Sequence, residues 1–372
     1  GTVDKSTGDQ VVGASDFGLY GYGFENENKE DNIDLYASIP FEVGKLEQEL
    51  IIGTMYNKSK KVKDNYTSNL NWTTLNFNNI SISEPTYSSS YPNSLDVTTQ
   101  SGMYLAGKFS LLENLKLISG ARLSSWKYKN EFGTGNREFD NEITPYVGLV
   151  YDINKNHSVY TSYTSIFKPQ DKKSVNGDYL DPIAGNNYEV GVKSEYFEGD
   201  LNTSLTLFRI EQDGVGEDTG TVNSNLESIY EAKDGVVSKG FEISVSGKVT
   251  ENLNLDFALA NFEAKNADGS KFNTTSSRTT ANLFAKYSIN DYRVAAGVNY
   301  KSKFYTDTSY GRITQDNYVT VDLMTGYKVN KNLDFQLNVN NLFDKEYYTG
   351  IGYNSMVYGD PRNATVSMKY TF

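Results

Sequence analysis

Roughly the last forty residues of the chain contain two segments in which apolar and polar residues alternate strictly. The first runs from Leu333 to Asn340 and the second from Ala364 to Phe372. A period of two places the apolar residues on one face of a strand and the polar residues on the other. A strand ending in an aromatic residue would leave an aggregating edge in a soluble sheet, whereas in a membrane barrel its apolar face meets lipid. We therefore interpret this stretch as the closing hairpin of an outer-membrane β-barrel.

The same strand–turn–strand unit recurs along the chain. Short clusters of Asn, Asp, Gly, Glu and Lys separate alternating segments, and such clusters mark tight turns between strands. After the first interval the clusters are spaced by roughly forty residues, which is the length of a hairpin plus one long loop. The predicted turns lie near Gly44-Lys45, Glu113-Asn114, Asn154-Lys155, Glu198-Gly199, Glu251-Asn252, Asn290-Asp291 and Asn330-Lys331.

Longer segments rich in Asn, Ser, Thr, Asp, Gly and Tyr connect these hairpins. Outer-membrane barrels have short periplasmic turns and long extracellular loops, so the long segments are predicted to face outside. They span about Lys60–Asp96, Asn130–Arg137, Lys168–Asn186, Gln212–Ser228, Lys265–Ser277, Tyr305–Asp316 and Glu346–Arg362.

The strand count bears on how much of a barrel this sequence represents. One strand before the first turn and two around each later turn give about fifteen, whereas bacterial barrels close with an even number. The first strand, through Ile33 and Ile39, should run from outside inward, and no signal peptide precedes it. We expect an all-β, antiparallel transmembrane barrel that is cut within an outer loop, with residues before Gly1 missing and an unpaired strand edge near Ile33–Phe41.

Composition narrows the function. The mean hydropathy is −0.55, and the chain has no run of about 18 apolar residues, so transmembrane helices are not expected. The net charge of −12 argues against nucleic acid as a partner, because phosphates need a basic protein face. The chain has no Cys, so disulfides and thiolate metal sites are excluded.

The residue types in this sequence do not favour catalysis or metal binding. The single His157 follows a turn and is predicted to be a structural, solvated side chain, which disfavours a hydrolytic barrel enzyme. The acidic residues Asp213, Glu217 and Asp218 do not have the fixed spacing of a calcium-binding EF-hand loop. We therefore predict no catalytic residue and no metal ligand.

Several stretches, in order along nearly the whole chain, resemble the barrel domain of TonB-dependent ferric-siderophore receptors. The similarity is greatest to the branch that serves hydroxamate-type siderophores such as coprogen, rhodotorulic acid and pyoverdine. The matching stretches are Ile33-Asp-Leu-Tyr-Ala-Ser-Ile-Pro-Phe41, Gly120-Ala-Arg-Leu-Ser-Ser-Trp126, Thr144-Pro-Tyr-Val-Gly-Leu-Val-Tyr151, Tyr160-Thr-Ser-Tyr-Thr-Ser-Ile-Phe-Lys-Pro-Gln170, Asn187-Tyr-Glu-Val-Gly-Val-Lys193, Ser238-Lys-Gly-Phe-Glu242, Asn341-Leu-Phe-Asp-Lys-Glu-Tyr-Tyr348 and Gly359-Asp-Pro-Arg to Phe372.

The resemblance implies a domain plan. Such receptors have an N-terminal plug with a short energy-coupling box, followed by a barrel of about 22 strands. Residues 1–372 would be the C-terminal portion of that barrel. Neither the plug nor the coupling box is found in this sequence, although the plug supplies half of the family's binding site and its link to TonB.

The candidates for ligand binding on one face of a predicted strand include Tyr128, and the leading candidate is Trp126. It shares the parity of Lys116, Arg122, Ser124 and Tyr128, so it should lie on the polar, lumen-facing side near the outer mouth. The resemblance supports an aromatic platform for the siderophore there. The alternative is an interfacial girdle residue.

Other candidates come from the loops and the lumen face. Trp72 and Tyr66 lie in the longest loop, where they would contact ligand from above or pack within the loop. Arg122 and Arg278 would attract an anionic ligand or pair with lumen carboxylates. Tyrosines in outer loops offer a large contact area and a hydroxyl group, although girdle tyrosines have the same appearance in sequence. The candidates of this kind are Tyr305, Tyr310, Tyr347 and Tyr353.

The resemblance implies an outer-membrane receptor that takes up ferric siderophores and is energised by the TonB-ExbB-ExbD system through the N-terminal region. The siderophore would carry the iron, so no cofactor is needed. The negative net charge favours a neutral or mildly charged hydroxamate over a highly anionic catecholate. The other expected partners are outer-membrane lipid and, at the loops, a phage or bacteriocin. The alternative function is a passive porin-like diffusion channel.

Overall fold

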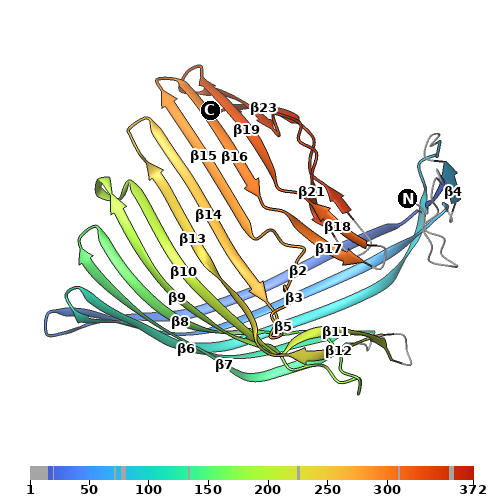
Figure 1. The fold of residues 1–372 in the computed structure, drawn as a ribbon, viewed down its shortest axis with the longest axis horizontal. Coiled ribbons are helices and arrows are strands. Elements are labelled where there is room, and N and C mark those ends of the chain that lie inside the picture. The colour runs from blue at the N-terminus through green and yellow to red at the C-terminus, as the bar shows by residue number, and fades with distance from the viewer. Residues whose placement is uncertain are drawn as a thin grey trace. The chain divides into compact units, whose positions relative to one another are not determined.

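The computed structural model describes residues 16–19, 21–70, 73–76, 81–132, 135–223, 227–308, 311–351 and 356–372. Within these ranges, fifteen antiparallel strands form one sheet in sequence order, as predicted; Figure 1 shows this succession for β8 to β19. The strands are β2 (Gly23–Val43), β3 (Leu46–Ser68), β5 (Tyr87–Leu112), β6 (Leu115–Asn130), β7 (Arg137–Asn154), β8 (His157–Lys168), β9 (Ile183–Tyr196), β10 (Leu201–Asp213), β13 (Val236–Lys248), β14 (Leu253–Lys265), β15 (Thr279–Ile289), β16 (Tyr292–Lys301), β19 (Tyr318–Lys328), β20 (Leu333–Asn340) and β23 (Asn363–Tyr370).

The seven predicted turns all join consecutive strands of this sheet. Their residue types suit the backbone that a tight turn needs. Gly44 has φ 68° and Asn290 has φ 50°, and both residue types adopt this left-handed conformation more readily than most. At Phe197–Gly199 the turn is a single 3-10 turn, labelled η1. The hairpin repeat is therefore confirmed.

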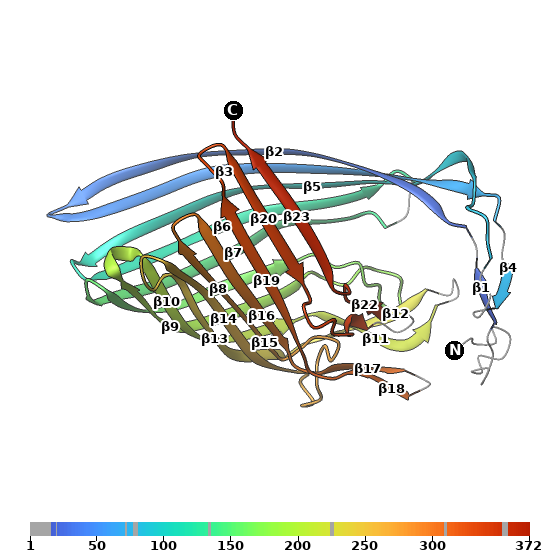
Figure 2. The ribbon, with the colours of Figure 1, turned by 90° about the horizontal axis from the view of Figure 1, so that it is seen from above.

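The longer connections contain short hairpins that the sequence did not predict. In Figure 2, two of these hairpins lie at one end of their neighbouring strands, and the short turns lie at the other end. Because both ends of each connection are held by sheet strands, its backbone groups can pair with one another rather than with water alone. The hairpins pair β11 (Val215–Val222) with β12 (Ser228–Lys233), β17 (Phe304–Thr308) with β18 (Gly311–Gln315), and β21 (Tyr348–Ile351) with β22 (Met356–Tyr358). In addition, β1 (Asp16–Leu19), which precedes β2, pairs with β4 (Thr73–Asn76) in the connection between β3 and β5.

The first long loop is shorter than predicted. Strand β3 continues to Ser68 and β5 begins at Tyr87, so both extend into the range from Lys60 to Asp96 that was assigned to a loop. Their lengths of 23 and 26 residues exceed the 9–11 residues or so that cross a bilayer. These extensions were not predicted as strands because their composition is polar. A strand outside the membrane needs no apolar face, so it lacks the alternation that reveals the other strands.

The register of the last two strands confirms that their apolar residues share one face. Val366 is opposite Leu337 and Met368 is opposite Phe335, whereas Ser367 is opposite Gln336. Apolar residues therefore face apolar residues across the pair. All eight residues of β23 are exposed, Val366 and Met368 at 72% and 66%, so the contact of the apolar face with lipid stays a prediction.

Apolar residues also face one another across other strand pairs. Leu283 on β15 is opposite Phe257 on one side and Val298 on the other. Exposed apolar residues also occupy alternate positions of β7, at Ile143, Val147, Leu149, Tyr151 and Ile153. Among the described residues, β2 has β3 as its one neighbour in the large sheet, which agrees with the strand edge expected near Ile33–Phe41.

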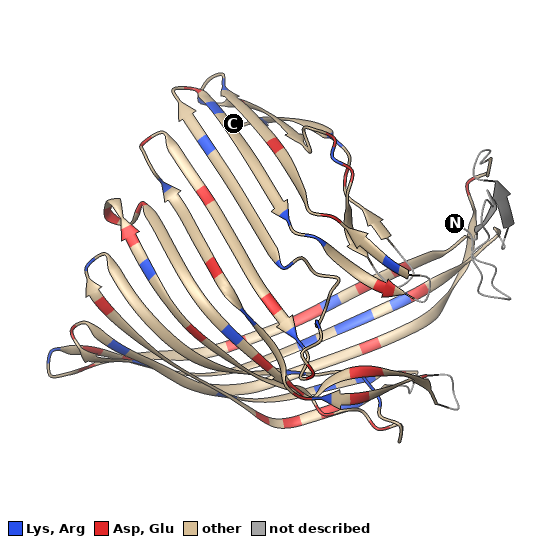
Figure 3. Cartoon of the chain, in the orientation of Figure 1, with Lys and Arg blue, Asp and Glu red and all other residues tan. Residues whose placement is uncertain are grey.

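Two compact units divide the chain. The first comprises Gly1–Ala37, Gly53–Tyr104 and Leu123–Glu142, and the second Ser38–Ile52, Leu105–Arg122 and Ile143–Phe372. In the first unit, β2 and β3 carry runs of charges of both signs (Figure 3). In the second, charged residues occur singly along most strands (Figure 3). No helix in the described ranges is long and apolar enough to span a bilayer.

A small hydrophobic core in the second unit joins two of the short hairpins. Phe304, Tyr318 and Ile351 are each at most 5% exposed and pack with Ile313 and Tyr348. The side chain of Gln315 adds a polar link, because its Oε1 accepts a hydrogen bond from the Tyr348 amide at 2.7 Å. Hairpins β17–β18 and β21–β22 are thus packed together.

Candidate ligand-binding site

Trp126 and Tyr128 project from the same face of β6, near its end at the β6–β7 connection. The residues are two apart, as the alternation requires. Their rings are stacked, with centroids 6.4 Å apart and planes 10° from parallel. Ser124, which has the same parity, is 1% exposed. This confirms that Trp126 shares a face with Ser124 and Tyr128.

Strand β7 contributes Arg137 and Phe139 to the same face. Along β7 the alternation of exposed and half-buried residues shifts by one position at Asp140 and Asn141, which are both exposed. Asn141 has φ 61°, and this left-handed residue acts like a bulge that reverses the facing of the residues before it. Arg137 and Phe139 are therefore half-buried, although parity counted from Thr144 would place them on the opposite face.

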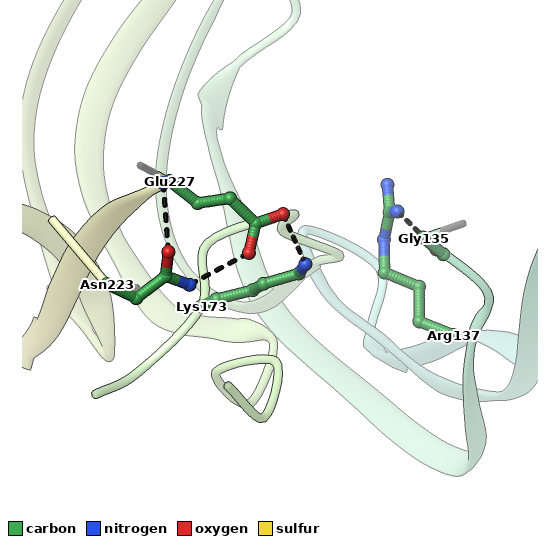
Figure 4. Close-up of polar contacts among 5 residues, drawn as sticks. All are labelled: Gly135, Arg137, Lys173, Asn223 and Glu227. Carbon is green, nitrogen blue, oxygen red and sulfur yellow. Dashed lines mark hydrogen bonds and ion pairs between the residues drawn. The ribbon is translucent and has the colours of Figure 1, made fainter. Parts of the chain in front are cut away.

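The four side chains form a cluster of stacked rings with one guanidinium group. The Arg137 guanidinium carbon lies 4.4 Å from the Tyr128 ring centroid and 5.4 Å from that of Trp126. Its Nη1 donates a hydrogen bond to the Gly135 carbonyl at 2.9 Å (Figure 4). Phe139 packs on Trp126 with centroids 5.8 Å apart. Such a cluster can stack a flat ligand group and attract negative charge.

Two other predicted residues contact their own surroundings. The Tyr66 hydroxyl donates to the Glu25 carboxylate at 2.7 Å, which joins β3 to β2. In the second unit, the carbonyl of Arg122 accepts a hydrogen bond from the Thr144 hydroxyl at 3.4 Å. Neither contact tests ligand binding, so the ligand-binding roles of Tyr66 and Arg122 stay predictions.

Arg278 stabilises a loop. Its guanidinium group lies over the Phe262 ring at 5.0 Å and donates to the Phe272 carbonyl. The loop preceding β15 is also joined to β17, because the Tyr305 amide donates to the Thr274 carbonyl at 2.9 Å. These contacts give Arg278 a structural role, and its proposed attraction of ligand stays a prediction.

The described loop tyrosines make different contacts. Tyr305 lies under the Arg312 guanidinium group at 4.0 Å. Tyr347 stacks on Tyr318 with centroids 4.4 Å apart and borders the small core described above. Three further predicted residues lie outside the described residues: Trp72, Tyr310 and Tyr353.

The β11–β12 hairpin is fastened to the segment that follows β8. Lys173 Nζ lies 2.9 Å from a Glu227 carboxylate oxygen, and the Asn223 amide donates to the other carboxylate oxygen at 2.9 Å (Figure 4). The Asn223 hydrogen bond and the Lys173 ammonium group hold the pKa of the Glu227 carboxyl below its usual value. The Tyr230 amide also donates to the Lys173 carbonyl at 2.8 Å.

His157 has structural contacts. Its Nδ1 lies 2.8 Å from the Ser194 hydroxyl and its ring packs edge-on against Tyr196. Across the described part of the chain, no three His, Cys, Asp or Glu side chains are grouped so that they could hold a metal ion.

Sequence reasoning found Trp126 and Tyr128 but missed Arg137 and Phe139. The Asp140-Asn141 pair was the available signal, because Asn tolerates the left-handed backbone that reverses strand facing. Sequence alone does not show where along a strand such a reversal occurs.

The family model "TonB dependent receptor-like, beta-barrel" matches residues 4–342. The chain therefore belongs to the TonB-dependent receptor β-barrel family, a family of outer-membrane receptors. Among its relatives, the ferripyoverdine receptor of Pseudomonas aeruginosa is 32% identical, in an alignment that covers 94% of this chain and 45% of that protein.

Solved structures give the same fold. The crystal structure of the Pseudomonas aeruginosa ferripyoverdine receptor bound to ferripyoverdine has a TM-score of 0.87 at 29% identity, over 98% of this chain and 51% of that one. A structure of the FpvAI–pyocin S2 complex has a TM-score of 0.86 at 29% identity, over 98% and 52%. The chain spans between 35% and 45% of the length of the curated pyoverdine receptors that it matches. These relatives are receptors and not enzymes.

Proposed function

We propose that this chain is part of a receptor that takes up ferric siderophores across the outer membrane. The observation that carries the proposal is the cluster of Trp126, Tyr128, Arg137 and Phe139, which presents stacked rings and a positive charge near the β6–β7 connection. A ligand that arrives with its iron already coordinated needs a contact surface of this kind and no iron-ligating side chains. The 32% identity to a ferripyoverdine receptor supports the same function.

The domain plan and the energy source form part of the same proposal. Residues 1–372 would be one β-barrel portion, and the TonB-ExbB-ExbD system would drive uptake through a plug encoded outside this sequence. Family membership supports this plan. Siderophore-dependent iron uptake by the full-length receptor should cease in cells lacking TonB. Uptake that persists without TonB would instead favour a passive channel.

A hydroxamate-type siderophore is the ligand class that we favour. Two cations of the described outer connections are paired with carboxylates: Lys173 with Glu227, and Arg312 with Asp307 at 2.7 Å. Together with the net charge of −12, this offers little compensation for a highly anionic catecholate chelate. In competition assays, a ferric trihydroxamate should displace a bound ferric siderophore more readily than a ferric tricatecholate does. The reverse order would refute the hydroxamate assignment.

The test of the binding site is siderophore affinity of the full-length receptor with Trp126→Ala. Loss of a buried aromatic contact should weaken binding by roughly 1–3 kcal/mol, measured by calorimetry, while heat-modifiable gel migration shows normal folding. The control is Tyr151→Ala, because Tyr151 lies on the apolar face of β7 and is 44% exposed. Unchanged affinity in a folded Trp126→Ala receptor would remove Trp126 from the site.

Bacteriocin binding is a second proposal for the loops. A pyocin complex exists among the similar structures, and the hairpins β11–β12, β17–β18 and β21–β22 offer paired strands for protein contact. Cells expressing the full-length receptor should become sensitive to a pyocin-type bacteriocin, and deletion of a hairpin tip should remove that sensitivity. Sensitivity that does not depend on the receptor would exclude this partner.

A further inference from the structure

Asp96 on β5 holds the outer end of β6 by two hydrogen bonds to a single carboxylate oxygen. The Tyr128 hydroxyl donates to Asp96 Oδ1 at 2.5 Å, and the Asn130 side-chain amide donates to the same oxygen at 2.7 Å. A carboxylate accepts strong hydrogen bonds from neutral donors. Asp96 therefore determines where the tip of the Tyr128 ring lies.

Asn130 extends this network into the β6–β7 connection. Its Oδ1 accepts a hydrogen bond from the Phe132 backbone amide at 2.8 Å, and the backbone amide of Asn130 donates to Asn136 Oδ1 at 2.8 Å. The adjacent Glu131 amide donates to the Leu95 carbonyl on β5 at 3.0 Å. The connection that leads to Arg137 is thus tied to β5 beside Asp96.

Tyr128 transmits this constraint to the aromatic cluster. One neighbour of its ring is Trp126, stacked almost parallel, and another is the Arg137 guanidinium group at 4.4 Å. If the phenol tip were released, the ring would be free to rotate toward solvent, and both neighbours would lose a packing surface.

We propose that Asp96 is a positioning residue for the aromatic ligand site, acting through Tyr128 to hold Trp126 and Arg137 in their stacked arrangement before ligand arrives. This inference rests on the proposed function of the cluster. Side chains that are ordered in advance bind with a smaller loss of conformational entropy than side chains that must be ordered by the ligand.

Two substitutions separate the hydrogen bonds from the charge. Asp96→Ala removes the acceptor and should weaken siderophore binding by about threefold to tenfold, the effect of having to order one or two side chains on binding. Asp96→Asn keeps an oxygen that can accept from both Tyr128 and Asn130, so its affinity should stay close to that of the unchanged protein. Asp140→Ala is the matched control, because Asp140 is an exposed carboxylate on the neighbouring strand β7.

The second measurement reports on the cluster without ligand. The near-ultraviolet circular dichroism of Trp126 is obtained as the difference between each full-length protein and its Trp126→Phe counterpart. Asp96→Ala should reduce this difference signal, whereas Asp96→Asn and Asp140→Ala should preserve it. Heat-modifiable gel migration confirms that each variant is folded.

Each other outcome overturns the inference. An unchanged Trp126 signal in Asp96→Ala refutes positioning, and weakened binding beside that unchanged signal shows direct contact with ligand. Equal losses in Asp96→Ala and Asp96→Asn show that charge, rather than hydrogen-bond acceptance, matters. If Trp126→Ala binds siderophore normally, the proposed function of the cluster fails. In that case the circular dichroism signal of Trp126, measured without ligand, still shows whether Asp96 orders Trp126.

Discussion

Asn341 offers a quantitative test of how the outer end of β20 is stabilised. Its side chain is 4% exposed and makes three hydrogen bonds. Nδ2 donates to the carbonyls of Lys345 and Asp360 at 2.9 and 3.0 Å, and Oδ1 accepts from the Lys345 amide at 2.8 Å. Asn341 also has φ 50°, which Asn adopts more easily than Ala. Its substitution therefore affects both hydrogen bonding and backbone strain.

The expected loss of stability follows from these contacts. Asn341→Ala leaves three backbone groups without their partner, and each unsatisfied buried group costs about 1–3 kcal/mol, with water reaching some of them. A non-glycine residue in the left-handed conformation costs about 1–2 kcal/mol more. We expect Asn341→Ala to lower the free energy of unfolding by about 3–5 kcal/mol. The loss for Asn341→Gly should be smaller than that for Asn341→Ala by up to about 1 kcal/mol, because Gly tolerates this backbone.

The assay is urea unfolding of the full-length receptor in detergent, with the folded fraction followed by heat-modifiable gel migration. Asn341→Asp serves as a third variant, because it retains the acceptor for the Lys345 amide but loses both donated hydrogen bonds. It should be at least as destabilising as Asn341→Ala, because a buried carboxylate oxygen would then face the carbonyl oxygens of Lys345 and Asp360. A loss below about 1 kcal/mol for Asn341→Ala would refute the hydrogen-bond argument. A larger loss for Asn341→Gly than for Asn341→Ala would refute the backbone argument.

Three further predictions test the register, the loop ion pair and a close strand contact. Val366→Arg should destabilise the barrel by roughly 2–4 kcal/mol and Ser367→Arg only mildly; equal losses in detergent unfolding would contradict the register. The pKa of Glu227 is lowered from 4.5, so its contacts contribute stability above that pH and are lost as the pH falls through the lowered pKa. Amide protection of β11–β12 should fall there, and Glu227→Gln should abolish this pH dependence. Gly240→Ala should cost about 1–3 kcal/mol in the same unfolding assay, because its Cβ would lie 2.1 Å from a backbone oxygen of β14. Gly148→Ala, with 3.4 Å of clearance, should have little effect.

The strands and turns of the main sheet could be predicted because their signals are local. Alternation fixes which face a residue occupies, and residues such as Gly44 and Asn290 adopt turn conformations that other residues resist. The same reasoning placed Trp126 and Tyr128 on one face, since they are two residues apart on one uninterrupted strand. The family resemblance pointed to the same segment.

Tertiary structure decided what these local signals leave open. Arg137 and Phe139 joined the cluster because Asn141 reverses the facing of β7, and Asp96 reached Tyr128 because β5 lies beside β6. The sequence of a polar strand has no apolar face to reveal it, so the outer ends of β3 and β5 and the three short hairpins were assigned to loops. Alternation specifies the face of a residue within one strand. Which residues meet across strands depends on register and backbone reversals, and those are set by pairing between segments distant in the chain.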